Sequence, residues 1–149
     1  MEPVFTIMSA YDMSTEDMVA LQQLLARYAH LVDDGDFERL REIFTTDVEF
    51  DASAYGMPPL TGIDAVVQSY VDSRHPVAHH VTNPLVIAHD DGTVNMRSKV
   101  ISLLMGGLCG SGTYDDVCVK TADGWRIARR TIGLRREQDL SRPPPRHVA

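Results

Sequence analysis

The sequence has few cysteines and no long apolar run, and each shortage excludes a class of protein. Its two cysteines, Cys109 and Cys118, are too few for a disulfide framework and do not have the CxxC spacing of structural zinc sites. We expect both thiols to be buried in a reducing compartment. No run approaches the roughly 18 apolar residues that a membrane span requires, and MEPVFTIMSAYDM lacks the basic start and apolar stretch of a signal peptide. These shortages predict a cytoplasmic protein with no membrane partner.

Positive charge is also scarce, and the formal net charge at pH 7 is −7. A protein that binds nucleic acid needs a basic surface to neutralise phosphates, so we expect no nucleic-acid partner. The arginines of IARRTIGLRRE are a local exception, but the alternation of a strand would divide them between two faces. A chain of 149 residues with 44% hydrophobic and 23% charged residues is typical of one ordinary globular domain.

The first half of the chain has the apolar periodicity of helices. Ser14 and Asp17 have the spacing of an N-cap and its acidic partner, and the amphipathic helix after them is expected to end near Asp34 and Gly35. A second, short helix is predicted for FERLREIF, capped by Asp36. The short strand VEFD and a third helix, IDAVVQSYVDSR, follow. The inward residues of the first helix are Met18, Leu21, Leu25, Tyr28 and Val32, and those of the third are Ile63, Val66, Val67 and Tyr70.

The second half changes to the period of strands. HHVTNPLVIAH, TVNMRSKVISLLM, TYDDVCVKT and WRIARRTIGL are predicted strands, and the turns DDG, GGLCGSG and ADG are short enough to join antiparallel neighbours. GGLCGSG lacks the GK[ST] ending of a phosphate-binding loop, so we interpret it as a wide turn or bulge. Helices followed by a strand meander predict an α+β domain, with three helices over one face of a curled antiparallel sheet. We expect a single domain over residues 14–136, a flexible leader over 1–13 and a disordered, proline-rich tail over 137–149.

Two adjacent histidines stand at the start of the first of these strands, in HPVAHHVTN. Alternate side chains of a strand point to opposite faces, which groups His79 with Val81, Asn83, Leu85 and Ile87. This set is the more apolar one, so we expect His79 to face the core and His80 to face outward. An inward histidine is most often a structural residue, unless a carboxylate beside it makes it a stronger base.

A candidate carboxylate lies at the end of the first helix, in LVDDGD. Negative charge at a helix C-terminus is unfavourable by roughly 0.3–1 kcal/mol. Asp36 is explained as the next cap and Asp34 can point to solvent, but Asp33 has no local structural reason. It is either a partner for His79 or a tolerated surface acid. Tyr28 lies within the apolar stripe of the same helix, where its hydroxyl needs a partner, so it belongs either to the core packing or to a site.

The segments YAHLVDDGDFERLREIF, VEFD, TGIDAVVQSYV, HHVTNPLV and DGWRIARR together resemble the SnoaL-like branch of the NTF2-like superfamily, over roughly residues 15 to 135. The resemblance implies a cone in which three helices close a bent antiparallel sheet over a deep apolar pocket. In dehydratases and dehydrochlorinases of this branch, an aspartate ends the first helix and a histidine opens a strand four residues ahead of an asparagine. These positions fall on Asp33, His79 and Asn83, and the tyrosine of bile-acid-type dehydratases falls on Tyr28.

The chain departs from scytalone dehydratase at three places. That enzyme has a tyrosine directly before the aspartate, where this chain has Val32, and another after its first strand, where this chain has Ala52. Its second active-site histidine stands on a later strand, and KVISLLMGG contains none. The resemblance therefore implies an acid–base pair here, but not the scytalone reaction.

The resemblance implies an enzyme, most simply a cofactor-free dehydratase in which Asp33 orients His79 as the base and Tyr28 donates a hydrogen bond. Its substrate would be a small, hydrophobic, oxygenated molecule, and the protein would form a homodimer or homotrimer. An isomerase or a polyketide-type cyclase needs the same groups, and a non-catalytic apolar-ligand-binding or dimerisation module is a further alternative. A metal site is disfavoured because adjacent strand histidines diverge. The expected substrate-binding residues are Phe50, Asn83, Val100, Ile132 and, as an anion-binding group at the pocket mouth, Arg129, although alternation does not decide between Arg129 and Arg130.

Overall fold

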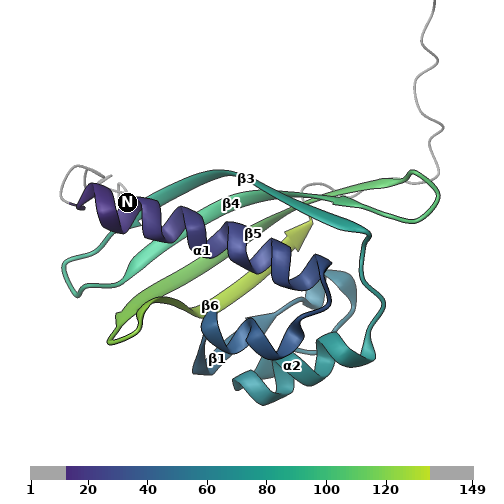
Figure 1. The fold of residues 1–149 in the computed structure, drawn as a ribbon, viewed down its shortest axis with the longest axis horizontal. Helices are drawn as coiled ribbons and strands as arrows, with labels where there is room; N and C mark the ends of the chain where they lie inside the picture. The colour runs from purple at the N-terminus through teal and green to yellow at the C-terminus, as the bar shows by residue number, and fades with distance from the viewer. Residues whose placement is uncertain (1–12, 135–149) are drawn as a thin grey trace, which may run out of the picture.

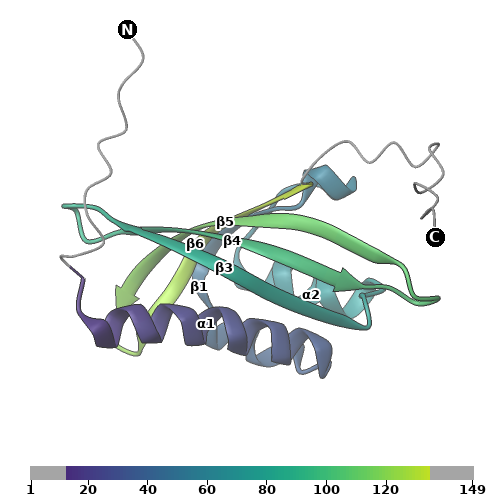
Figure 2. The ribbon, with the colours of Figure 1, turned by 90° about the horizontal axis from the view of Figure 1, so that it is seen from above.

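The computed structural model describes residues 13–134 (Figure 1). The predicted tail and all of the predicted leader except Met13 lie outside these residues. A six-stranded sheet has the order β2-β1-β6-β5-β4-β3, and two α-helices lie on its concave side (Figure 2). The helices are α1 (Thr15–Asp33) and α2 (Ile63–Asp72), with 3₁₀ helices η2 (Phe37–Glu42) and η3 (Ser53–Tyr55); the strands are β1 (Phe44–Asp51), β2 (Leu60–Thr61), β3 (Ala78–Ala88), β4 (Val94–Leu103), β5 (Cys109–Thr121) and β6 (Gly124–Leu134).

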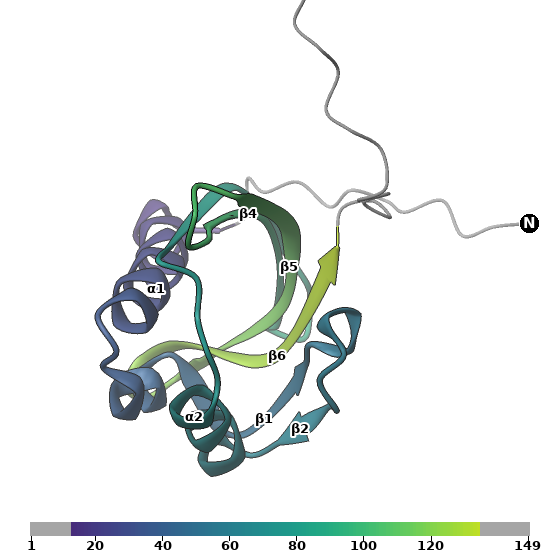
Figure 3. The same ribbon diagram turned by 90° about the vertical axis from the view of Figure 1, so that its right-hand side faces the viewer.

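The sheet is mixed, which corrects the expectation of an antiparallel one. Strands β3 to β6 form the predicted antiparallel meander, but β1 pairs with β6 in parallel. Short turns predict the direction of strands that follow one another in the chain, and β1 and β6 are joined by no such turn. Seen end-on, the sheet curls around an interior that α1 and α2 close on the other side (Figure 3). The α+β cone is therefore confirmed, with a parallel pairing between β1 and β6.

The first helix begins as predicted, whereas the second is a different kind of helix. The Ser14 hydroxyl accepts a hydrogen bond from the Asp17 amide at 3.1 Å. The segment after Asp36 forms the 3₁₀ helix η2, Asp36 makes no side-chain cap bond, and Phe44 already belongs to β1. The prediction of three α-helices is therefore wrong by one. A six-residue segment is too short to gain much from α-helical hydrogen bonding, and 3₁₀ geometry is common in such short pieces.

An irregularity in β3 changes which of its side chains face the interior. In β3 the register shifts between Thr82 and Leu85, and Asn83 has a φ of 53°. Beyond this bulge Val86 is buried while Leu85 is 60% exposed, so the expected inward position of Leu85 is wrong. An extra residue in one strand reverses the alternation after it.

The core fills the space between the concave face of the sheet and the apolar side of α1. Cys118 is buried in it, but Cys109 is exposed at the start of β5, which corrects the prediction of two buried thiols. The sequence GGLCGSG is only partly a turn, because its last four residues belong to β5. Within residues 13–134, no helix is long and apolar enough to cross a membrane.

Candidate active site

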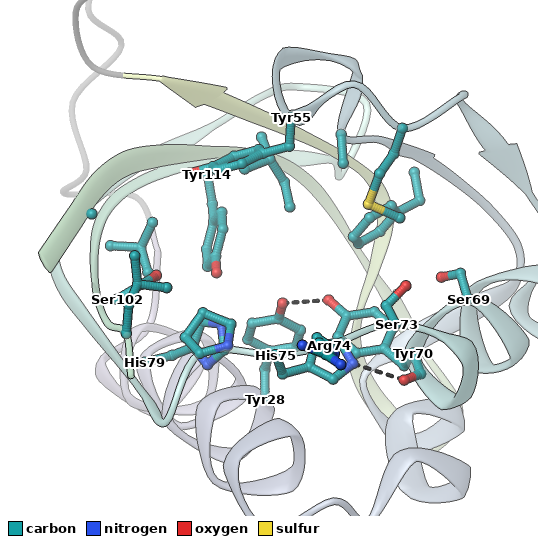
Figure 4. Close-up of a pocket in the computed structure, with 18 residues that line it drawn as sticks. Tyr28, Tyr55, Ser69, Tyr70, Ser73, Arg74, His75, His79, Ser102 and Tyr114 are labelled. Atoms are coloured by element: carbon teal, nitrogen blue, oxygen red, sulfur yellow. Dashed lines mark hydrogen bonds between the residues drawn. The ribbon is translucent and has the colours of Figure 1, made fainter. Parts of the chain in front are cut away.

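A cavity of about 450 Å³ lies inside the cone. Its walls come from α1, α2, the inner face of the sheet and the segment that joins α2 to β3 (Figure 4). A volume in the range of roughly 300–1,000 Å³ suits a small organic ligand. Its apolar lining includes Phe50, Ala52, Met57, Val100, Leu104 and Ile132, and its polar lining includes Tyr28, Tyr55, Tyr70, His75, His79, Ser102 and Tyr114.

Asp33 contacts His79, which lines this cavity. His79 Nδ1 lies 2.7 Å from Asp33 Oδ1, and the backbone amide of His79 donates to both carboxylate oxygens, at 2.9 and 3.1 Å. Asp33 ends α1 and His79 is the second residue of β3, so the packing of α1 against β3 brings them together. The side chains are 23% and 8% exposed. The ring of His79 is therefore held in one orientation, while its outward neighbour His80 is exposed.

This hydrogen bond determines which ring nitrogen of His79 is available. An ionised carboxylate can only accept, so Nδ1 carries the hydrogen that it shares with Asp33. In the neutral imidazole Nε2 then has no hydrogen and can accept a proton. No residue of the range 13–134 forms a hydrogen bond with Nε2. The arrangement leaves a base within reach of a molecule in the cavity.

Tyrosine hydroxyls form a second polar group in the cavity. The Tyr28 and Tyr70 hydroxyls lie 2.6 Å apart (Figure 4), and the Tyr114 ring packs edge-on against the Tyr28 ring, with centroids 5.7 Å apart. Burial raises the pKa of the Tyr70 and Tyr114 hydroxyls well above the usual value for tyrosine, and nearby Tyr28 adds to this effect. These two phenols therefore stay protonated at neutral pH and can donate hydrogen bonds.

A buried ion pair packs against two of the tyrosine rings. Arg130 donates to Asp116 through Nε and Nη2 at 2.8 and 2.7 Å, and neither side chain is exposed. Its guanidinium lies 4.2 Å from the ring centroids of both Tyr28 and Tyr114, which is a cation–π distance. Burial opposes the charge of Arg130, but Asp116 outweighs it and raises the pKa of the guanidinium. A fixed cation therefore lies behind two tyrosine rings of the cavity.

The buried tyrosines predict a loss of stability at alkaline pH. In an unfolded chain tyrosine ionises at a pH of about 10, whereas Tyr70 and Tyr114 hold their protons to higher pH when folded. The unfolded state then binds fewer protons than the folded state, so the free energy of unfolding falls as the pH rises above about 10. We expect urea unfolding between about pH 9 and about pH 11 to show this fall, and Tyr70→Phe to reduce its slope. An unchanged slope in Tyr70→Phe would contradict a raised pKa at that residue.

Three of the expected substrate-binding residues line the cavity, and two do not. Phe50, Val100 and Ile132 are part of its wall. Asn83 is exposed at the bulge of β3 and accepts a hydrogen bond from the Thr82 hydroxyl. Arg129 is also exposed, on the outer side of β6, where it pairs with Glu49 at 2.7 Å. The expectation that Asn83 and Arg129 contact a substrate in this cavity is therefore corrected.

The bulge in β6 explains why alternation could not choose between the two arginines. The register shifts between Ile127 and Arg129, so Ile127 and Arg130 are both buried although they differ in parity. Arg130 is the inward arginine, but it lies beneath the tyrosines and does not line the cavity.

Several polar residues of the cavity were not among the predicted site residues. Helical spacing predicts only that Tyr70 belongs to the core, and no pattern in the sequence marks Tyr114 or His75 as a site residue. The sequence does contain a signal for the ion pair. One predicted strand contains DD and the next contains RR, and two strands joined by a short turn pair in an antiparallel way. The register of these strands places Asp116 opposite Arg130. Within residues 13–134, no three His, Cys, Asp or Glu side chains come together as metal ligands would.

Comparisons with known proteins agree with this architecture. Rv2910c, an uncharacterised protein of Mycobacterium tuberculosis, is 33% identical over 127 residues, covering 76% of this chain and 82% of that protein. A solved structure of a candidate aromatic ring hydroxylase from Novosphingobium aromaticivorans is 29% identical, with a TM-score of 0.71 over 83% of this chain and 92% of that one. A candidate scytalone dehydratase from the same species is 24% identical, with a TM-score of 0.65 over 77% of this chain and 81% of that one, which is a likeness of fold.

The family assignment covers most of the described residues. Residues 13–131 match the SnoaL-like domain, and the solved structures similar to this chain include an NTF2-like protein with a cystatin-like fold. The protein whose cone encloses Asp33, His79 and the tyrosines thus belongs to the SnoaL-like family and has the NTF2-like fold.

Proposed function

We propose that this protein is a cofactor-free acid–base enzyme that removes water from a hydrophobic molecule carrying a hydroxyl group β to a carbonyl. The single observation that supports this proposal most is the bond between His79 Nδ1 and Asp33, at 2.7 Å in the wall of an apolar cavity. A merely structural histidine would not need its second nitrogen to lie against a cavity of this size. The similarity to a candidate aromatic ring hydroxylase supports an aromatic body for the ligand.

In the proposed reaction His79 Nε2 removes the proton from the carbon next to the carbonyl. The electron pair of that C–H bond moves to the carbonyl oxygen and gives an enolate, and the imidazolium that forms is stabilised by the Asp33 carboxylate. The enolate then re-forms the carbonyl and makes a carbon–carbon double bond as the β C–O bond breaks. His79 returns its proton to the departing oxygen, so one water leaves and the enzyme is unchanged.

The tyrosines would stabilise the enolate oxygen. Tyr28 and Tyr70 share one hydrogen bond between them, which leaves one phenolic hydrogen for the cavity, and Tyr114 supplies another. Donors held in place before the reaction are most effective where charge develops, because no solvent has to reorganise. The apolar wall excludes water and strengthens these hydrogen bonds. Each of these groups belongs to α1, α2 or β5, all fixed elements of the cone.

A dehydration assay in D₂O tests the proposal. Purified protein is incubated with a panel of polycyclic and aliphatic β-hydroxy ketones, and water loss is followed by mass spectrometry and by the absorbance of the new conjugated double bond. We expect turnover of at least one member of the panel. Deuterium uptake at the α-carbon without water loss would favour an isomerase or a cyclase, because both need the same base. Binding without exchange or water loss across the panel would contradict acid–base catalysis and favour a ligand-binding module.

Self-association is a separate part of the proposal. We propose that the protein forms a homodimer or homotrimer. Light scattering on the purified chain measures the mass of the assembly directly.

A further inference from the structure

Within residues 13–134, the lining of the cavity has a single formally charged residue at its mouth. Arg74 is the only arginine, lysine, aspartate or glutamate among the lining residues of that range. It belongs to the segment of residues 73–77 that joins α2 to β3 and runs across one end of the cone (Figure 3). A molecule in the cavity therefore meets one cation and no carboxylate at this end.

Arg74 differs from the other arginines of residues 13–134 in having no partner among those residues. Every other arginine within residues 13–134 pairs with a carboxylate or, in the case of Arg126, with backbone carbonyls. Arg74 forms neither kind of contact with any of those residues. The chain has a net charge of −7, so carboxylates are abundant and an arginine without one is unusual here. No residue of the described range therefore competes with a ligand for its guanidinium.

The residue next to Arg74 fixes the backbone that carries it. His75 Nε2 lies 2.7 Å from the Tyr70 carbonyl oxygen, and because a carbonyl can only accept, Nε2 is the donor. The His75 ring also stacks on the Tyr70 ring, with centroids 4.9 Å apart and planes 8° apart. This attachment holds the segment against the end of α2. Figure 4 shows Arg74 and His75 together with Tyr70 at the cavity.

We propose that Arg74 binds a carboxylate of the ligand, so that the substrate is an amphipathic acid with its apolar body in the cavity and its anionic end at the mouth. The inference rests on the proposed function, in that it takes this cavity to be the substrate site. The planar guanidinium matches a carboxylate through two parallel hydrogen bonds. Ser73 lies on the same segment and provides a hydroxyl group that can donate a hydrogen bond to the carboxylate. Arg74 would thereby fix which end of the substrate faces His79.

A carboxylate fits this mouth better than a phosphate does. A phosphate monoester carries about two negative charges at neutral pH, and phosphate sites usually combine several cations or a helix N-terminus. This mouth offers one arginine, and the segment that carries it follows the C-terminal end of α2, where the helix dipole disfavours anions. A single negative charge is what one exposed guanidinium can balance.

Binding of three naphthalene probes tests this inference without requiring turnover. The probes are 2-naphthoate, its methyl ester and 2-naphthyl phosphate, which share the ring system and differ in charge. We expect wild-type protein to bind 2-naphthoate about tenfold more tightly than the ester in calorimetric titrations, as one charge-assisted hydrogen-bonded pair would give. Arg74→Gln should lose this preference. Arg97→Gln is the matched control, because Arg97 is an exposed arginine on β4 that pairs with Asp115 and does not line the cavity, and it should keep the preference.

Several results would overturn the inference. These are a preference that persists in Arg74→Gln, equal or tighter binding of the ester by wild type, tighter binding of the phosphate, and the failure of all three probes to bind. His79→Gln in the same assay separates this inference from the proposed function, since His79 does not hold the carboxylate. If His79→Gln keeps the preference while the wild-type protein turns over no member of the dehydration panel, the carboxylate site stands and the dehydratase proposal fails.

Discussion

Replacing His79 by glutamine is expected to lower kcat of the dehydration by about 10²–10⁴-fold, the usual contribution of a positioned general base. Glutamine fills much of the same volume but cannot accept a proton from carbon. The fold should survive the change, because the backbone amide of residue 79 still donates to both oxygens of Asp33. The measurement is kcat on the best substrate of the dehydration panel, together with the midpoint of urea unfolding.

His80→Gln is the matched control for this prediction. His80 is the next residue of β3 and points away from the cavity, so its replacement should leave kcat within about twofold of wild type, since exposed substitutions away from special features have small effects. Asp33→Asn should also lower kcat, since an amide no longer stabilises the imidazolium. A His79→Gln variant that is folded and retains wild-type kcat would show that the base is elsewhere.

The imidazole nitrogen that acts as the base can be checked independently of any substrate. If Asp33 fixes the tautomer, ¹⁵N chemical shifts of the His79 ring in the neutral protein should show hydrogen on Nδ1 and none on Nε2. His80 has no such partner within the described residues, and its ring provides the internal comparison. The same tautomer at both residues would remove the argument for a special role of Asp33.

The sequence allowed the α+β class and the position of His79 to be predicted, because both depend on local periodicity, whereas the cone with its pocket was implied by the resemblance to the SnoaL-like family. Helical spacing defined the inward face of α1, and strand alternation placed His79 inward before the bulge of β3. The unexplained charge of Asp33 at a helix end was a local signal as well, and the structure places that carboxylate 2.7 Å from the His79 ring. Local sequence patterns of this kind predict the position of a side chain correctly when no bulge lies between the pattern and the site.

The misplaced residues lie beyond irregularities or depend on contacts between distant elements. Asn83 is at the bulge of β3 and Arg129 directly follows the bulge of β6, and one extra residue reverses the face of every side chain after it. The hydroxyl pair of Tyr28 and Tyr70 joins residues 42 positions apart in the chain. Periodicity predicts that each of two such residues is buried, but it does not predict that they meet.

Replacing Arg130 by methionine is expected to lower the free energy of unfolding by about 3–5 kcal/mol, because Asp116 would remain buried without a partner. Both side chains are fully buried and joined by two hydrogen bonds. The variant also loses the cation that packs against the rings of Tyr28 and Tyr114. We expect kcat of the dehydration to fall, because these rings are then held less firmly. Domains of this size are stable by roughly 5–15 kcal/mol, so urea unfolding at pH 7 should still resolve a folded baseline.

Substitution of the neighbouring Arg129 is a control that separates the effect of burial from the effect of losing a charge on the free energy of unfolding. Arg129→Met removes an arginine one position away whose pair with Glu49 is about 60% exposed on both sides, and such pairs contribute roughly 0–1 kcal/mol. The double variant Asp116→Leu/Arg130→Met removes both buried charges, and replacing a buried pair with apolar residues is often neutral or stabilising by about 1–4 kcal/mol. We therefore expect the double variant to be more stable than Arg130→Met alone. If it is folded, stable and inactive, Arg130 serves the tyrosines of the site; if it is stable and active, the ion pair only contributes to the specificity of the fold.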